Sequence, residues 1–293
     1  MQNSFRFSGH DTFYCKEQWL LKGVQATEKE GFNYLRNIKA ISDLGVGKNM
    51  VRSIQHWLKS FNLINDDEEL SKFSKLIFTE NSFDPYLEFD GSLWLLQYQL
   101  CKRKYASIFK IIFSDYFKDK AVFEFSDFQI YRYVNSELKK IGYKNIASKT
   151  FSGDFKVFIK TYLPQVKSYK TVEDDFNVPL VSLNLIEDTG RLNDKGQNVY
   201  RLNVDNHKIP VEILAFCILD YFRNDTAISF EDISNTIGSY LCLTNDKLDQ
   251  LLVELADYFN EFIYKNDAGI RQIQIRVEYK DALKIKILRS YYE

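Results

Sequence analysis

A short polar segment near the start of the chain, Ser8-Gly9-His10-Asp11-Thr12, groups residue types that could do chemistry. The side chain of His10 titrates near neutral pH, and a carboxylate such as that of Asp11 can orient its ring for acid–base catalysis. Together with Lys16, the segment could instead contact a phosphate. A structural interpretation also fits, because the polar side chains around His10 can accept backbone N–H groups at a helix start while His10 lies half-buried. From these residues alone, the structural interpretation is favoured.

A second polar group lies on a helix-turn-helix predicted between Ile38 and Ile64. Ile38, Ile41 and Leu44 share one helical face, Gly45-Val46-Gly47 can form the turn, and apolar residues recur at helical spacing from Val51 to Phe61. The second helix would direct outward side chains that can meet phosphates and base edges, namely Lys48, Asn49, Arg52, Ser53, His56 and Lys59. An ordinary helical hairpin with a solvated polar face would give the same pattern.

A stripe of lysines marks a third group, on a helix predicted to start at Ser148. Aromatic and aliphatic residues from Phe151 to Tyr162 face inward at helical spacing, so the outward positions are the candidate phosphate contacts Lys149, Lys156 and Lys160.

Charge is distributed unevenly along the chain, although the formal net charge is only −1. Residues 1–60 carry a net +4 and residues 101–170 a net +9, whereas residues 61–100 carry −6 and residues 171–293 carry −8. Phosphate binding depends on local positive charge, so a near-neutral total does not exclude DNA binding. The two basic blocks contain the second and third polar groups.

The elements expected to position these groups are mainly helices with small β-hairpins, an α+β fold. The order helix, helix, β-ribbon recurs along the chain and predicts tandem winged-helix-like units. One ribbon is expected at residues 180–186 and 199–204, and another at residues 262–264 and 273–277. The predicted domains are an N-terminal helix-turn-helix domain with the FSGHDTF loop (1–106), a basic second domain (107–204) and an acidic C-terminal domain (205–293).

Several functional classes are disfavoured by composition. Cys15, Cys101, Cys217 and Cys242 are far apart and form no C-x-x-C pair, so they are expected to be small buried residues and not zinc ligands or disulfides. Gly45 to Asn49 lacks the length of a phosphate-binding loop, and the acidic groups lack a recognisable nuclease pattern. The sequence shows no signal peptide and no membrane span, which leads us to expect a cytoplasmic protein without a membrane partner.

Three blocks of sequence resemble the SspB-like family of bacterial DNA phosphorothioation systems, a domain-of-unknown-function family. The blocks are Phe7 to Phe13, then Leu44 to Ile54 with Trp57, and Asp84 to Glu88 before Gly91 to Leu96. After Phe13 the family tends to continue with Pro-Leu-Arg, whereas this chain has Tyr14-Cys15-Lys16, so an arginine role there would fall on Lys16.

This resemblance implies a protein that binds double-stranded DNA and nicks it to allow sulfur insertion. Such proteins act beside a cysteine desulfurase, an ATPase and a sulfurtransferase-like enzyme, and the resemblance raises His10, Asp11 and Lys16 as catalytic candidates. A divalent metal, Mg²⁺ or Mn²⁺, would serve if nicking is intrinsic. Two alternatives remain open: a non-catalytic winged-helix transcriptional regulator, and a DNA-bound scaffold whose acidic C-terminal domain recruits other modification proteins.

Overall fold

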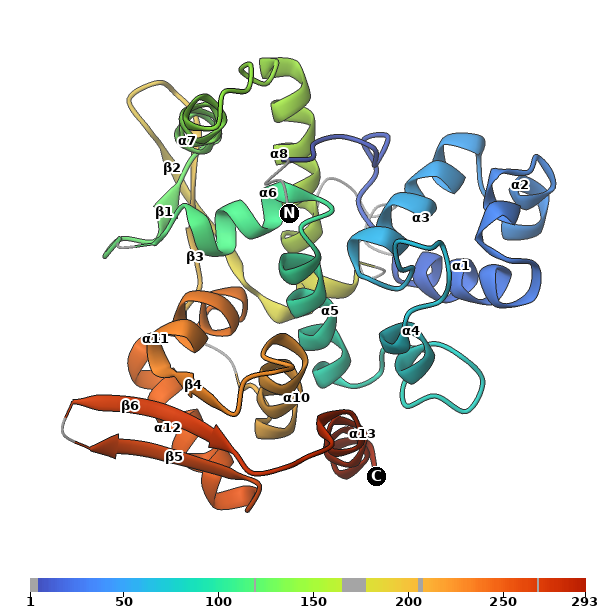
Figure 1. Ribbon diagram of the computed structural model, residues 1–293. Coiled ribbons are helices and arrows are strands. Elements are labelled where there is room, and N and C mark those ends of the chain that lie inside the picture. The colour runs from blue at the N-terminus through green and yellow to red at the C-terminus, as the bar shows by residue number, and fades with distance from the viewer. Residues whose placement is uncertain (1–4, 119, 165–177, 205–207, 268) are drawn as a thin grey trace. The chain divides into compact units, whose positions relative to one another are not determined.

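Helices make up most of the structure and two small antiparallel sheets accompany them, so the α+β class predicted from the sequence is confirmed (Figure 1). The structure, a computed structural model, describes residues 5–118, 120–164, 178–204, 208–267 and 269–293. The chain divides into two units, Met1–Asn203 (unit 1) and Val204–Glu293 (unit 2). The predicted C-terminal domain began at residue 205, one residue after the start of unit 2.

Unit 1 begins with the predicted helix-turn-helix and a helix that packs on it. The elements are α1 (Glu17–Glu30), the 3₁₀ helix η1 (Phe32–Arg36), α2 (Lys39–Leu44) and α3 (Lys48–Ser60). Gly45 makes the turn in a left-handed conformation (φ 66°), which glycine adopts without steric cost. Ile38, expected to pack inward, is 81% exposed, because it precedes α2 as its N-cap residue. Gly23 of α1 allows close packing on α3, since a Cβ there would lie 2.9 Å from Ile54.

The next helices form the centre of unit 1, and their start explains one of the sequence blocks. They are α4 (Lys72–Ile77) and α5 (Asp90–Arg103). The carboxylate of buried Asp84 accepts the backbone N–H groups of Glu88 (2.8 Å) and Phe89 (3.0 Å) and the hydroxyl of Ser92 (2.6 Å). Asp84 therefore fixes the chain at the entrance to α5. From Gly91 to Cys101 every residue of α5 is buried, as expected for a helix surrounded by other elements.

The rest of unit 1 contains three strands and the lysine-bearing helix. In order, the elements are α6 (Ser107–Lys110), the π-helical turn η2 (Ile111–Asp115), β1 (Glu124–Phe125), α7 (Asp127–Lys140), α8 (Ser148–Tyr162), the 3₁₀ helix η3 (Pro179–Leu183), β2 (Ile186–Leu192) and β3 (Asn198–Leu202). The sheet order is β1-β3-β2, and both pairings are antiparallel. The strand predicted from residue 180 is wrong at its start: Pro179 begins a 3₁₀ helix, and the strand begins only at Ile186.

Aromatic residues join the two halves of unit 1 into one core. The ring of Trp57 on α3 lies 5.9 Å from that of Phe109 on α6, and Phe109 lies 5.4 Å from Phe158 on α8. All three rings are buried. The boundary predicted between residues 106 and 107 therefore does not separate two compact units, because side chains from both sides of it share this core.

Unit 2 repeats the order of elements seen from α6 to β3. It contains α10 (Val211–Tyr221), β4 (Ala227–Ser229), α11 (Phe230–Ile233), the π-helical turn η4 (Ser234–Gly238), α12 (Asn245–Tyr258), β5 (Phe262–Asp267), β6 (Ile270–Ile275) and α13 (Lys280–Tyr292). The strand order β4-β6-β5 matches the order β1-β3-β2 of unit 1. The predicted hairpin is present, whereas the sequence patterns used above missed α13, which packs against α10 through Leu283, Ile287 and Leu288.

The sequence also made one prediction about the four cysteines and one about membrane-spanning helices. All four cysteines are buried, as predicted. Within the described ranges, no helix is long and apolar enough to cross a membrane.

Candidate functional site

The loop of residues 7–13 lies between α8 and α3 in unit 1 (Figure 1). Its backbone is unusual, since Ser8 (φ 66°), Asp11 (φ 46°) and Thr12 (φ 66°) are all left-handed, a conformation that costs free energy for residues other than glycine. The backbone N–H of Ser8 donates to both carboxylate oxygens of Asp154 on α8, at 2.9 and 3.0 Å. Contacts with α8 thus hold this strained loop in place.

His10 is buried (5% exposed), and both of its ring nitrogens face protein groups. Nδ1 accepts the backbone N–H of Thr12 (3.1 Å), and Nε2 lies 3.3 Å from Oδ1 of Asp154. This contact does not meet the geometry of a hydrogen bond, so Nε2 faces the carboxylate without a hydrogen-bond partner among the described residues. The carboxylate that faces the His10 ring is that of Asp154, whereas the adjacent Asp11 pairs with Arg52.

Asp11 connects the loop to the predicted DNA-reading helix. Its carboxylate lies 2.8 Å from Nε of Arg52 on α3, and Arg52 also donates to the side-chain oxygen of Asn49 (2.8 Å). The Arg52 side chain remains 56% exposed. The first and second polar groups of the sequence therefore meet at this ion pair.

Two residues of α3 do not point outward as predicted: Ser53 and His56 are buried. The ring of His56 lies 5.6 Å from that of His10, 5.4 Å from that of Trp57 and 5.5 Å from that of Tyr105. For His56 the prediction failed because Gly9 and His10 of the 7–13 loop pack against its ring. In this structure neither side chain is available to DNA.

The environment of His56 keeps its ring neutral. Burial, followed by the nearby His10 and Arg6, lowers the pKa of His56 to about 3. Neither ring nitrogen of His56 has a hydrogen-bond partner among the described residues. The backbone of Gly9 approaches this ring closely: a Cβ at Gly9 would lie 2.8 Å from Nδ1 of His56.

The remaining predicted site residues lie at or near the surface. Lys48 and Asn49 are exposed at the start of α3, and Lys149 and Lys156 are exposed on α8. Lys160 is partly buried, with its ammonium group 5.9 Å from the centre of the Tyr14 ring. Lys16 is also partly buried and is the N-cap residue of α1.

Asp154 is the site residue that the sequence patterns above did not identify. A signal for it exists in the sequence, because residue 154 follows Phe151 by three positions and precedes Phe158 by four. It is therefore a charged residue on the apolar face of α8, and a buried charge requires a partner. For the described part of the chain, no group of three or more His, Cys, Asp or Glu side chains is arranged to hold a metal ion.

The loop, its two supporting helices and the surrounding fold can be compared with known proteins. The profile of the family described as "Protein of unknown function (DUF4007)" matches residues 7–292, so the chain belongs to this family.

Two solved structures share the fold. One, described as a magnesium ion-bound SspB crystal structure, superposes with a TM-score of 0.82 at 22% identity, covering 99% of this chain and 88% of that chain. The other, described as an SspB crystal structure, gives a TM-score of 0.80 at 21% identity with the same coverage, 99% and 88%. The resemblance to SspB-like proteins thus extends to the whole described fold. A comparison with curated proteins gave no match.

Proposed function

We propose that this protein binds double-stranded DNA as a component of a bacterial DNA phosphorothioate modification and defence system. The observation that carries the proposal is the bridge formed by the 7–13 loop. Asp11 of the loop pairs with Arg52 of α3, while Asp154 of α8 accepts the backbone N–H of Ser8 and faces the ring of His10. One ordered loop thus connects the two helices that display exposed basic residues.

The order of elements supports DNA binding. From α6 to β3, the order helix, strand, helix, helix, strand, strand and the sheet order β1-β3-β2 are typical of winged-helix proteins. In this interpretation α8 holds the position of a recognition helix, and α2 with α3 forms a further helix-turn-helix. Lys149 and Lys156 would contact phosphates from α8, while Lys48, Asn49 and Arg52 would contact DNA from α3.

Substitution of Arg52 tests this interface. Arg52→Ala should weaken duplex binding more than Lys247→Ala, a matched removal of a cation from α12 of unit 2. Removing one phosphate contact should also reduce the slope of log affinity against log salt by about 1. Titrations of labelled duplex at several salt concentrations give both quantities. Unaltered binding by the Arg52 variant would refute the proposed interface.

The role in phosphorothioation is proposed from the fold shared with the SspB structures and from the sequence resemblance. The proposed partners are a cysteine desulfurase, an ATPase and a sulfurtransferase-like enzyme. Deletion of the gene should remove phosphorothioate linkages from host DNA, and Arg52→Ala should fail to restore them. Mass spectrometry of digested DNA measures these linkages directly. Normal modification in the deletion strain would leave the DNA-binding proposal standing but remove this role.

Nicking is a second candidate activity, favoured by the magnesium ion in one of the SspB structures. The protein should then convert supercoiled plasmid to open circle when Mg²⁺ or Mn²⁺ is supplied. No metal ligands are assigned, because the described residues contain no group of three or more His, Cys, Asp or Glu side chains that could hold a metal ion. His10→Ala should abolish nicking while duplex binding persists.

A second substitution distinguishes chemistry from loop support. In His10→Asn, the amide oxygen can still accept the N–H of Thr12, but the imidazole is lost. Nicking by His10→Asn at the wild-type rate would limit His10 to a positioning role. If the wild-type protein binds duplex but does not nick it under any of these conditions, the regulator or scaffold alternatives apply.

A further inference from the structure

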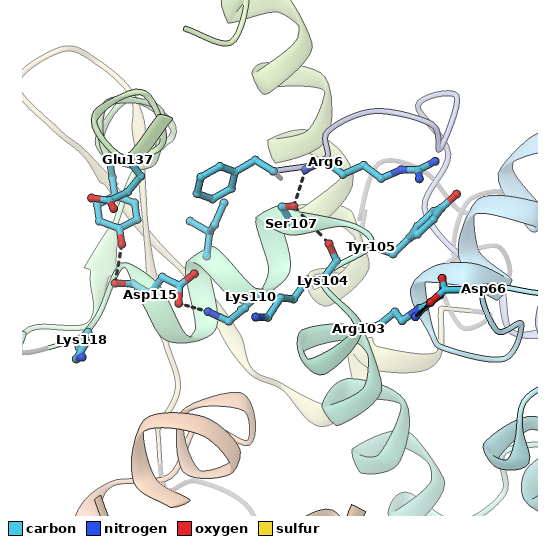
Figure 2. A pocket seen from close by; sticks show the side chains of 13 residues that line it. Arg6, Asp66, Arg103, Lys104, Tyr105, Ser107, Lys110, Asp115, Lys118 and Glu137 are labelled. Carbon is cyan, nitrogen blue, oxygen red and sulfur yellow. Dashed lines mark hydrogen bonds and ion pairs between the residues drawn. The ribbon is translucent and has the colours of Figure 1, made fainter. Parts of the chain in front are cut away.

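Unit 1 contains a cavity of about 640 Å³ that none of the proposed DNA contacts line (Figure 2). Its walls come from Phe5 and Arg6, from the end of α5, and from α6, η2 and α7. The volume falls within the range of small-molecule sites in proteins. Five of the lining side chains are cationic and three are anionic.

The three carboxylates of the cavity are each paired with a cation. Asp66 binds Arg103, Asp115 binds Lys110, and Glu137 lies 2.6 Å from Lys140. Among the described residues, Arg6, Lys104 and Lys118 have no carboxylate partner. The cavity therefore has an excess of positive charge that no internal ion pair neutralises, which suits an anionic ligand.

Of these three residues, Lys104 has an unusual backbone conformation. It is the C-cap residue of α5 and is left-handed (φ 59°), a conformation usually taken there by glycine or asparagine. Burial, and then the positive charge of Lys110, lowers the pKa of Lys104. In Figure 2 the side chains of Lys104 and Lys110 extend towards the same part of the cavity. An anion bound beside Lys104 would offset the repulsion between its ammonium group and that of Lys110.

The side chain of Arg6 presents a flat cationic surface. The guanidinium group of Arg6 stacks on the ring of Tyr105 at 3.6 Å from its centre. The backbone of Arg6 is fixed by two hydrogen bonds: its N–H donates to Oγ of Ser107 (2.7 Å), and the N–H of Ser107 donates to its carbonyl (3.1 Å). Phe5 and Ile111 add apolar surface. A guanidinium plane held against an aromatic ring is suited to stacking on a nucleobase.

We propose that this cavity binds a nucleoside phosphate. The phosphate group lies beside the ammonium group of Lys104, and the base stacks on the Arg6 guanidinium. This site is separate from the proposed duplex contacts on α3 and α8 and does not depend on them.

Calorimetric titration of the full-length protein with deoxyadenosine monophosphate tests the proposal. The key variant is Lys104→Gly, because glycine removes the ammonium group and also prefers the left-handed backbone, so the fold is retained. It should bind the nucleotide about tenfold more weakly, as expected for one lost charge-assisted contact. The matched control is Lys29→Ala, which removes an 80% exposed lysine of α1. Its affinity should equal that of the wild type.

Two further probes identify the ligand class. Adenosine lacks the phosphate and inorganic phosphate lacks the base, so both should bind more weakly than the nucleotide. The proposal is overturned if the wild-type protein does not bind the nucleotide at millimolar concentration, or if Lys104→Gly binds it equally well. Equal affinity for adenosine or for inorganic phosphate would also overturn it. Duplex titrations with Arg52→Ala report separately on the proposed function.

Discussion

At the scale of single residues, the two buried histidines have different relations to their surroundings. His10 accepts a hydrogen bond from Thr12 at Nδ1, whereas neither ring nitrogen of His56 has a hydrogen-bond partner among the described residues. Protonation of a buried imidazole that has no hydrogen-bond acceptor costs free energy, because the charged form would lose its hydration. The ring of His56 is therefore a group whose protonation opposes folding.

This arrangement predicts a defined pH dependence of stability. The pKa of His56 falls from an ordinary 6.5 to about 3 in the folded protein. As the pH drops through 6.5, the unfolded chain binds a proton at His56 that the folded chain does not bind. The free energy of unfolding should therefore fall by up to about 1.4 kcal/mol per pH unit between these two values, and His56 should add no pH dependence above 6.5.

Urea unfolding of the wild type and of His56→Leu across this range measures the effect. The variant should show a shallower dependence, smaller by about one proton, because leucine does not titrate. Carboxylates titrate in both proteins and cancel in the comparison. Identical slopes would mean that His56 is accessible to protons in the folded state.

At the scale of elements, helical periodicity was sufficient to predict α3 and α8. It was not sufficient to predict which polar residues each helix buries. Ser53 and His56 fall beside the apolar face of α3 and are both buried, and His56 is buried because the 7–13 loop packs against its ring. Asp154, on α8, is buried against the same loop, because its carboxylate accepts the backbone N–H of Ser8. Such contacts join residues far apart in sequence, where local periodicity carries no information.

Gly9 in the 7–13 loop and Gly153 in α8 give a matched test of how closely the loop packs against α3. Gly9 has φ 99°, and a Cβ there would lie 2.8 Å from Nδ1 of His56. Gly9→Ala should therefore lower the free energy of unfolding by about 2 kcal/mol or more. Gly153 lies within α8, and a Cβ there would meet nothing within 4 Å. Gly153→Ala should instead raise stability by about 0.5–1 kcal/mol. A neutral effect of Gly9→Ala, measured by urea unfolding, would contradict the tight approach of the loop to α3.

At the scale of the whole molecule, the two compact units carry net charges of opposite sign. Residues 1–203 contain twenty-nine Lys and Arg against twenty-five Asp and Glu, whereas residues 204–293 contain ten against fifteen. The boundary between the two units lies at residue 204. The basic unit contains all the residues proposed to contact DNA. The acidic unit is correspondingly better suited to protein contacts than to phosphates.

Unit 2 should fold without unit 1, because it has a core of its own. The inward faces of α10, α12 and α13 and the sheet β4-β6-β5 supply buried aliphatic and aromatic side chains, including Leu214, Leu252 and Ile287. Domains of this length and smaller fold alone when they bury such a core. We expect residues 204–293, expressed alone, to show helical circular dichroism and one cooperative thermal transition.

Neighbouring residues of α12 provide the controls for this fragment. Leu252 is 0% exposed, so Leu252→Ala should cost about 2–5 kcal/mol and abolish or strongly lower the transition. Val253 is 45% exposed, and Val253→Ala should leave the transition unchanged or slightly raise it, because alanine has the higher helix propensity. Equal sensitivity of the fragment to both substitutions would show that its helices form without the specific core, and absence of any cooperative transition would show that unit 2 requires unit 1 to fold.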